Sequence, residues 1–452
     1  MSKIAIYMMS GLMLAGCGVC GQYHRADNLV HDLCGGAAAD SGKVAIVSVP
    51  WREMFRDAKL QSLIETALER NSDLNVAHQR VVAAEAAMSA ARLAYAPSVN
   101  LNAEGGLSRY DGAAAKTYNV GASASWELDI FGRLTAAKRG AFASLQESRA
   151  YQQAVQTQLV ADVACGYYTL AWLDAQMAIN SRTLDNWRAT VRTLEALKRV
   201  GMANEAGVLQ ARANVMQLQS SQHAISKSIS EAESALSVML GMPPRMIERN
   251  ALADAHVPDG IFVGVPLRML ANRPDVRQAE MQLAQAFYAT KEAGAAFYPQ
   301  VTLSGALGWT NNGGGAIVNP GQWLLNAIGS LTQPLFNRGA NVANLKIAQA
   351  KQEEARLLFR KVLLDAGKEV NDALAACQTS KMQYEVSACL VETRREAVEK
   401  TELLMRHSNV TYLEILTAQQ ALLEAETQQL QASFDRIQSV IKLYHALGGG
   451  VM

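Results

Sequence analysis

Proline is nearly absent from this 452-residue chain, which contains only ten prolines. Two long stretches, 133–240 and 338–447, contain none. Glycine is scarce there as well and is limited to Gly140, Gly166, Gly201, Gly207, Gly339 and Gly367. Because proline breaks helices and glycine weakens them, these stretches can form helices far longer than the usual three turns. We therefore predict two helical hairpins, over 133–240 and 338–447, the first turning at Gly201.

The chain also lacks a long apolar run and an excess of charge of either sign. No apolar stretch reaches the roughly 20 residues that a membrane-spanning helix needs. Lysine and arginine number 42 and aspartate and glutamate 41, so the formal net charge is +1. Such a chain has no basic field for a phosphate backbone. We therefore exclude nucleic acid as a partner.

Recognisable catalytic and metal-binding patterns are missing too. The seven histidines are scattered, and the sequence contains no H-E-x-x-H, G-x-S-x-G or phosphate-binding loop. Cys17 and Cys20 form one C-x-x-C pair, but no second pair completes a zinc site. Cys377 and Cys389, about 18 Å apart along one predicted helix, cannot bridge each other. We predict that the protein is not an enzyme and holds no cofactor or metal.

The N-terminus has the pattern of a secretory signal. Lys3 precedes a short apolar run that ends in Leu14-Ala15-Gly16-Cys17. This ending resembles the lipobox of bacterial lipoproteins, which implies a signal peptide at 1–16 and lipidation of Cys17. Residues 17–50 would then form a lipid-anchored tether, in which Cys20 and Cys34 could pair in an oxidising compartment.

Strand-like alternation appears in four segments. A helix predicted from about Asp57 to Ala96 ends at Pro97, and apolar and polar residues then alternate with the two-residue period of a strand. The predicted strands cover about 99–108, 118–129, 300–310 and 323–333. In each hairpin a polar or glycine-rich link joins two strands, and a long helix follows the second.

The two halves of the chain repeat this order. Asn71-Ser72-Asp73-Leu74 aligns with Arg273-Pro274-Asp275-Val276 at a separation of 202, and the hairpin tips align at 207. Each unit consists of a helix, two strands and two long helices. The first repeat covers 51–250 and the second 266–447, with a connector at 251–265 and a tail at 448–452.

The length of the strands suggests a membrane β-barrel with one lipid-facing and one polar face. Four strands cannot close a barrel, since the smallest membrane barrels have about eight. Three copies would supply twelve strands. The predicted fold is therefore mainly α with a membrane β-barrel contribution, in which a trimer closes a 12-stranded barrel that an α-helical barrel continues.

Four motifs carry a resemblance to a known family: 126–133 (Trp-Glu-Leu-Asp-Ile-Phe-Gly-Arg), 272–280, 333–336 (Gln-Pro-Leu-Phe) and 412–419. With them, the chain resembles the TolC-like outer-membrane efflux channels, in the lipoprotein branch that serves three-part pumps. The resemblance implies an outer-membrane homotrimer with a helical barrel in the periplasm. It also implies a periplasmic adaptor (membrane fusion) protein and an inner-membrane RND-type pump as partners, with small molecules as cargo.

The same resemblance assigns candidate functional residues near the ends of the helical hairpins. Adaptor-docking tips are expected at Gly201, Met202, Ala203, Asn204, Ser408, Asn409 and Val410. Glu414 falls where relatives place an acidic residue of the pore constriction, and Thr417 replaces a second acid. Three copies of Glu414 around a narrow axis would attract cations and repel anions. The alternative is that Glu414 is a solvated carboxylate on a helix surface.

Two other functions are compatible with parts of this pattern. An outer-membrane duct for ATP-driven (type I) protein secretion would use the same architecture. A structural coiled-coil lipoprotein would need only the long helices and the lipid anchor, but the four alternating strands argue against it. The exported substrate cannot be read from the sequence, because a passive duct takes its specificity mainly from its pump.

Overall fold

The computed structural model describes residues 21–24, 50–110, 113–201, 203–255, 273–310, 322–406 and 412–449. The chain divides into two compact units. The first takes Met1–Asp32, Gln79–Ala150 and Arg277–Val362, and the second takes Leu33–His78, Tyr151–Val276 and Leu363–Met452. Each unit therefore combines segments from both predicted repeats.

The elements follow the duplicated order that the sequence predicts. The first half contains α3 (Trp51–Met54), α4 (Ala58–Arg70), α5 (Ser72–Leu93), β1 (Ser98–Tyr110), β2 (Ala113–Leu128), α6 (Arg133–Arg199) and α7 (Glu205–Met239). The second half contains η3 (Leu252–Asp254), α8 (Pro274–Ala295), β3 (Gln300–Thr310), β4 (Gln322–Thr332), α9 (Ala340–Arg406) and α10 (Tyr412–Ala446). The helices α6 and α9 have 67 residues each, about 100 Å of helix. Strand β2 begins five residues before its predicted start.

A search of the described helices finds none with the length and apolarity needed to cross a membrane.

The single helix predicted from Asp57 to Ala96 is wrong, because the chain breaks at Asn71 into α4 and α5. Asn71 has an extended backbone (φ −60°, ψ 129°), and its side-chain oxygen accepts a hydrogen bond from the Leu74 amide at 3.0 Å. Asparagine is a favoured helix N-cap, so it ends one helix and begins the next. Its amide group donates to the Met239 carbonyl at 2.9 Å, which ties this break to the end of α7.

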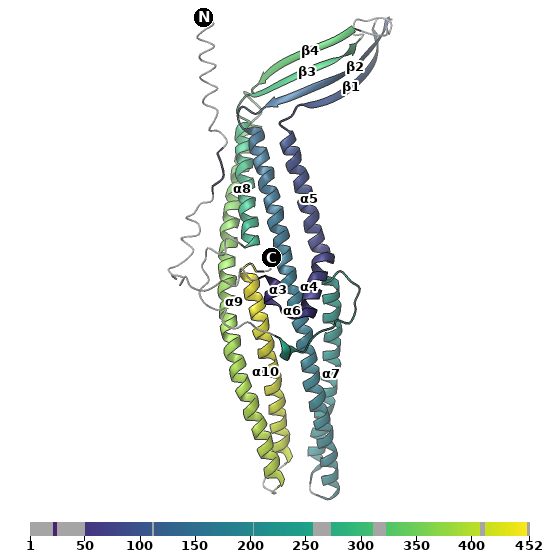
Figure 1. Cartoon of the computed structure of the whole chain (residues 1–452), viewed down its shortest axis with the longest axis vertical. Coiled ribbons are helices and arrows are strands. Elements are labelled where there is room, and N and C mark those ends of the chain that lie inside the picture. Colours follow the sequence, from purple (N-terminus) through teal and green to yellow (C-terminus); the bar gives the residue numbers. More distant parts are fainter. Residues whose placement is uncertain are drawn as a thin grey trace. The chain divides into compact units, whose positions relative to one another are not determined.

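The first unit contains a four-stranded antiparallel sheet in the order β1-β2-β3-β4 (Figure 1). Pairs that face each other in the register, such as Leu101 with Ala122 and Leu307 with Leu325, lie on the same side of the sheet. One side thus carries large apolar side chains, all 38% to 88% exposed: Val99, Leu101, Val120, Trp126, Leu303, Leu307, Trp309, Leu325 and Leu331. The opposite side carries polar residues: Asn100, Asn102, Glu104, Ser123, Ser125, Thr302, Ser304, Asn326 and Ser330.

The repeats meet where β2 pairs with β3, and two glycines face each other there. A Cβ atom on Gly121 would lie 2.6 Å from the Leu307 carbonyl oxygen, and one on Gly308 would lie 2.6 Å from that of Val120. Side chains therefore do not fit at this pair. The polar side of the sheet departs from this pattern in β4, the strand whose alternation is weakest in the sequence. There Ile328 is 51% exposed, and Leu324 pairs with Gly308 in the register.

The joint between β2 and α6 is fixed by side chains from the motif 126–133. Asp129 caps α6 by accepting hydrogen bonds from the amides of Leu134 (2.9 Å) and Thr135 (2.8 Å). Arg133 binds both carboxylate oxygens of Glu127, at 2.9 and 2.5 Å. Gly132 adopts a φ of 77°, which glycine accommodates without strain.

At the second joint, between β4 and α9, Asn337 occupies the position that corresponds to Gly132 in the first repeat. The residues with positive φ are instead Arg338 (47°) and Gly339 (79°). The helix α9 accordingly begins at Ala340 rather than Arg338. This joint, residues 333–339, is therefore three residues longer than the first, residues 129–132.

In the second unit, equivalent contacts join the start of each short helix to the end of each hairpin. Asn71 donates to Met239, and Arg273 donates to the Ala446 carbonyl oxygen at 2.5 Å. The donors are separated by 202 residues and the acceptors by 207, as in the sequence repeat. Both α7 and α10 end in a Schellman motif, with Gly241 (φ 67°) and Gly448 (φ 82°) in the left-handed position.

Arg249 and Asn250, directly before the predicted connector, bind to α6 and α7. Arg249 contacts Asp174 at 2.5 Å and Glu233 at 2.6 Å, and the Asn250 amide donates to the hydroxyl of Tyr167 at 2.9 Å. Residues 256–272, which include most of the predicted connector at 251–265, lie outside the described part of the chain.

Candidate functional site

The tip of the first helical hairpin lies between α6 and α7. Gly201 has a φ of 78° and turns the chain, and the Asn204 side chain caps α7 by accepting from the Gly207 amide at 2.9 Å. An ion pair between Lys198 and Glu205 joins the two helices at the turn. Ala203 packs on the adjacent apolar cluster, whereas Met202 lies outside the described residues.

At the second hairpin, α10 begins at Tyr412, and the predicted tip residues Ser408, Asn409 and Val410 fall outside the described residues. Glu414 lies in the first turn of α10, where a negative charge is stabilised by the helix dipole. Thr417 lies one turn further along, and both side chains are exposed. The structure thus brings the two predicted constriction residues together on one face of α10.

The residues between them have the opposite environment. Ile415 and Leu416 are 5% and 4% exposed. Leu416 belongs to an apolar cluster with residues of α6 and α7: Leu184, Trp187, Leu194, Val208, Ala211 and Leu218. Burial of one large apolar side chain contributes about 1.5–3 kcal/mol. This cluster therefore holds the start of α10, with Glu414 on its outer side, against the first hairpin.

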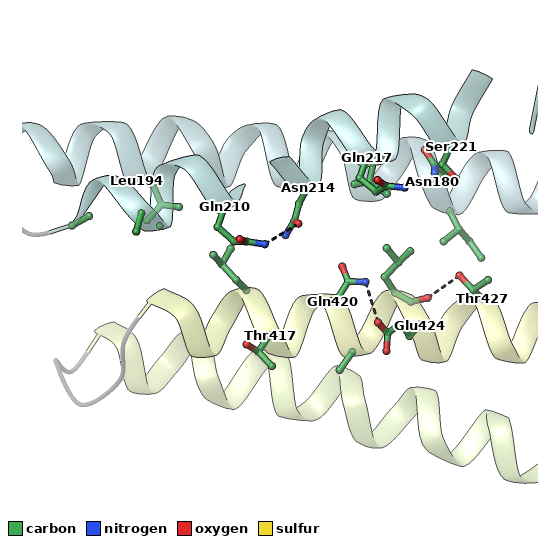
Figure 2. A pocket seen from close by; sticks show the side chains of 18 of the residues that line it. Asn180, Leu194, Gln210, Asn214, Gln217, Ser221, Thr417, Gln420, Glu424 and Thr427 are labelled. Atoms are coloured by element: carbon green, nitrogen blue, oxygen red, sulfur yellow. Dashed lines mark hydrogen bonds between the residues drawn. The ribbon is translucent and has the colours of Figure 1, made fainter. Parts of the chain in front are cut away.

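A cavity of about 1270 Å³ lies between the two hairpins, and we call it the interhairpin cavity. Leu194, Leu218 and Leu416 of the cluster form part of its lining. Its lining is rich in amides and hydroxyls, and Figure 2 shows Gln210 and Asn214 of α7 opposite Gln420 and Glu424 of α10. Both pairs bond along their own helix: the Gln210 amide donates to Asn214 at 3.5 Å, and the Gln420 amide donates to Glu424 at 3.1 Å. The Asn180 side chain is 6% exposed, and its Oδ1 has no hydrogen-bond partner within the described residues. The lining is polar enough to hold water.

Further along α10, Glu426 joins the two hairpins through charges. Its carboxylate lies 2.5 Å from the Arg182 guanidinium of α6 and 3.6 Å from that of Arg395 of α9. The Glu426 side chain is 13% exposed, whereas the two arginines are 60% and 48% exposed. Sequence reasoning missed this group, because its members are 31 to 244 residues apart in the chain and no local pattern links them.

A second charged group surrounds Arg273, which is 4% exposed. Besides the Ala446 carbonyl it contacts Asp275 at 2.8 Å and Glu369 at 2.6 Å. The pKa of Glu369 is lowered to about 2, first by His445, whose Nδ1 lies 3.6 Å from the carboxylate, and then by Arg273. Pro274 at the first helical position and Asp275 in the first turn suit the start of α8, but the buried Arg273 guanidinium also binds the end of α10.

Three cysteines fall within the described chain. Cys165 is half-buried, Cys377 buried and Cys389 exposed, and all three are free thiols within helices. Burial raises the pKa of Cys165 to about 11, so it is not a reactive thiolate. Among the described residues, no group of three His, Cys, Asp or Glu side chains could hold a metal ion. Cys17, Cys20 and Cys34 lie outside the described part.

Comparison with known proteins gives the same picture as the geometry. Residues 63–242 and 265–449 match the family described as Outer membrane efflux protein. The solvent efflux pump outer membrane protein SrpC of Pseudomonas putida is 28% identical over 457 residues, which cover 98% of this chain and 97% of that one. SilC of Salmonella typhimurium, named a probable outer membrane lipoprotein, is 28% identical over 411 residues, 88% of each chain.

The fold agrees as well. A crystal structure of CusC, described in connection with folding and transmembrane channel formation, superposes with a TM-score of 0.85 at 27% identity, over 96% of this chain and 100% of that one. The family match spans both repeats and all four long helices. The resemblance expected from the sequence motifs is therefore confirmed, and this chain belongs to the outer membrane efflux protein family.

Proposed function

We propose that three copies of this chain form an outer-membrane channel that serves as the exit duct of a tripartite efflux pump. The cargo would be small molecules, such as drugs, toxic compounds or metal ions, delivered from the periplasm or the pump to the exterior. The partners would be a periplasmic adaptor and an inner-membrane RND-type pump. The protein would act as a conduit and not as an enzyme.

The observation that carries this proposal is the exposed apolar side of the four-stranded sheet. In the described chain, β1 and β4 each pair with one strand only, so both edges offer unpaired backbone groups. Such edges invite pairing with another copy, and a membrane requires that every backbone group be paired. Four strands from each of three copies would give twelve, an even number within the range of membrane barrels.

The direct continuation of the strands into helices supports a single conduit. The capped joint at Asp129 leaves no flexible linker between β2 and α6. The barrel wall would therefore continue into a wall of long helices, whose far ends carry the tips 201–204 and 408–410 proposed for adaptor docking. Glu414 and Thr417, exposed beside these tips, would line the constriction. Cys17 would be acylated and insert its lipid into the outer membrane.

Electrophoresis and planar-bilayer recording of the purified mature protein test the proposal together. We expect a trimer band that persists in detergent without heating and disappears on boiling, and conductance steps after insertion. A Cys17→Ser variant should lose lipid label and keep both properties. A monomer that neither resists the detergent nor conducts would overturn the proposal.

A further inference from the structure

The short described segment 21–24 lies four residues after Cys17 and contacts helices of the first unit. The Tyr23 amide donates to the hydroxyl oxygen of Tyr288 on α8 at 3.2 Å. Its ring packs edge-on against Phe287, with centroids 5.9 Å apart. Nearby, the Arg139 guanidinium of α6 donates to the Gly21 carbonyl at 3.3 Å. Two helices therefore hold the segment through both its backbone and its side chain.

The helical residues that bind this segment are themselves fixed. The rings of Phe287 and Tyr288 pack edge-on at 5.4 Å, and the Lys291 ammonium lies 5.3 Å from the centroid of Phe287. The seam between α6 and α8 is narrow here, since a Cβ on Gly140 would lie 3.6 Å from the Cβ of Tyr288. A formed surface, rather than one flexible side chain, receives Tyr23.

This surface lies close to the ends of α6 and α8 that connect to the strands. Arg139 lies six residues after the start of α6, and Tyr288 lies seven residues before the end of α8. Both are therefore about 10 Å along the helix from the strand joints. The chain from Cys17 to Gly21 can span at most about 14 Å. A lipid on Cys17 thus reaches the level of the strand joints while the segment stays bound.

From this match we propose that Arg139, Phe287 and Tyr288 form an N-terminal docking site that holds the acylated end of the chain at the inner surface of the outer membrane. The inference rests on the proposed function, because it requires both the barrel and the lipid. Docking would place the lipid anchor and the sheet in one membrane at a fixed relative depth. The rest of the tether, up to residue 50, would then not contribute to anchoring the protein in the membrane.

Limited proteolysis tests the docking site, because the first trypsin site of the mature chain follows Arg25, directly after the segment, and the next follows Lys43. The ratio of cleavage at the two sites in opened outer-membrane fragments is measured by mass spectrometry after reduction. Cleavage of a bound segment tracks the population of its open form. The variants Tyr23→Ala, which removes the ring, and Tyr288→Phe, which removes the hydroxyl acceptor, should each raise the ratio about fivefold.

The neighbouring variant Gln22→Ala, at an exposed position, is the matched control and should leave the ratio unchanged. The Cys17→Ser variant tests the lipid. If docking and membrane insertion are compatible, its ratio should equal that of the acylated protein. Two results would overturn the inference. One is cleavage at Arg25 that is as fast in the wild type as in Tyr23→Ala. The other is cleavage at Arg25 that is several times faster in the acylated protein than in Cys17→Ser.

The same spectra distinguish failure of docking from failure of the proposed function. The mass of the N-terminal tryptic peptide reports directly whether Cys17 is acylated, and trimer resistance to detergent is read on the same samples. An unacylated wild-type peptide would refute the lipid anchor and, with it, the depth function of the docking site. Acylated, conducting trimers with no effect of Tyr23→Ala or Tyr288→Phe would refute the docking site alone.

Discussion

We predict that the ion pairs of Glu426 stabilise the contact between the two hairpins. Glu426 is the one side chain of its group that is mostly buried, and it contacts Arg182 of α6 at 2.5 Å. If the entrance widens by separating the hairpins, this contact exists only in the narrow state. A substitution at Glu426 should then shift the balance toward the wide state.

The size of the shift follows from the exposure of the partners. Hydrogen bonds to charged groups contribute about 1.5–3 kcal/mol, but exposed ion pairs contribute only about 0.2–1 kcal/mol. Arg182 is 60% exposed, and Arg395 is more distant, at 3.6 Å. We therefore expect Glu426→Gln to cost the narrow state about 1 kcal/mol. This corresponds to about a fivefold change in the ratio of the two states.

Planar-bilayer recording measures this ratio as the fraction of time spent at high conductance. The matched control is Glu424→Gln, which removes the same charge two residues earlier, where the carboxylate bonds to Gln420 within α10. A double-mutant cycle with Arg182→Ala should be non-additive, because both changes remove one contact. Equal effects of Glu424→Gln and Glu426→Gln, or additive effects in the cycle, would refute an interhairpin role.

Three further predictions concern other parts of the chain. Glu414→Ala should lower the selectivity for cations in reversal-potential measurements, and unchanged selectivity and conductance would remove Glu414 from the constriction. Gly121→Ala should reduce the yield of detergent-resistant trimer, because the new Cβ would lie 2.6 Å from a facing carbonyl oxygen, whereas Gly105→Ala, with no atom within 4 Å, should not. The Glu369 pKa falls from 4.5 to about 2 on folding, so its contribution to stability is complete above pH 4.5 and is lost as the pH falls toward 2. The melting temperature should therefore drop less between pH 5 and pH 2.5 in Glu369→Gln than in the wild type, and an equal drop would contradict this.

The elements were predictable because their signals are local. The absence of proline and the scarcity of glycine indicate α6 and α9. Strict alternation of apolar and polar residues indicates β1 and β3, because the two faces of each strand meet different environments. Local signals also explain the error at Asn71, since the apolar spacing continues across it while one side chain caps α5. In the second joint, Arg338 takes a left-handed conformation that no residue preference favours.

The candidate site was only partly predictable, because many of its contacts join residues that are distant in the sequence. Glu414 and Thr417 were located through a motif of contiguous residues, and the structure leaves them exposed on one face. The contacts of Glu426 and those of Arg273 join residues from different helices, so their partners emerge only when the hairpins are folded. A sequence can show that Arg273 follows a helix-start pattern, but not that its guanidinium is buried against the end of α10.

Comparison of the two repeats shows where the duplicated halves have diverged. The same tie between a short helix and the end of a hairpin is neutral in the first repeat, through Asn71, and charged in the second, through Arg273 with Glu369. An amide bonded to a carbonyl does not respond to pH, whereas a guanidinium held between carboxylates loses attraction when they are protonated. Acid should therefore weaken the tie through Arg273 before the tie through Asn71. The two hairpins share this tie, but only in the second is the tie itself charged, and the second also carries Glu414 at its other end.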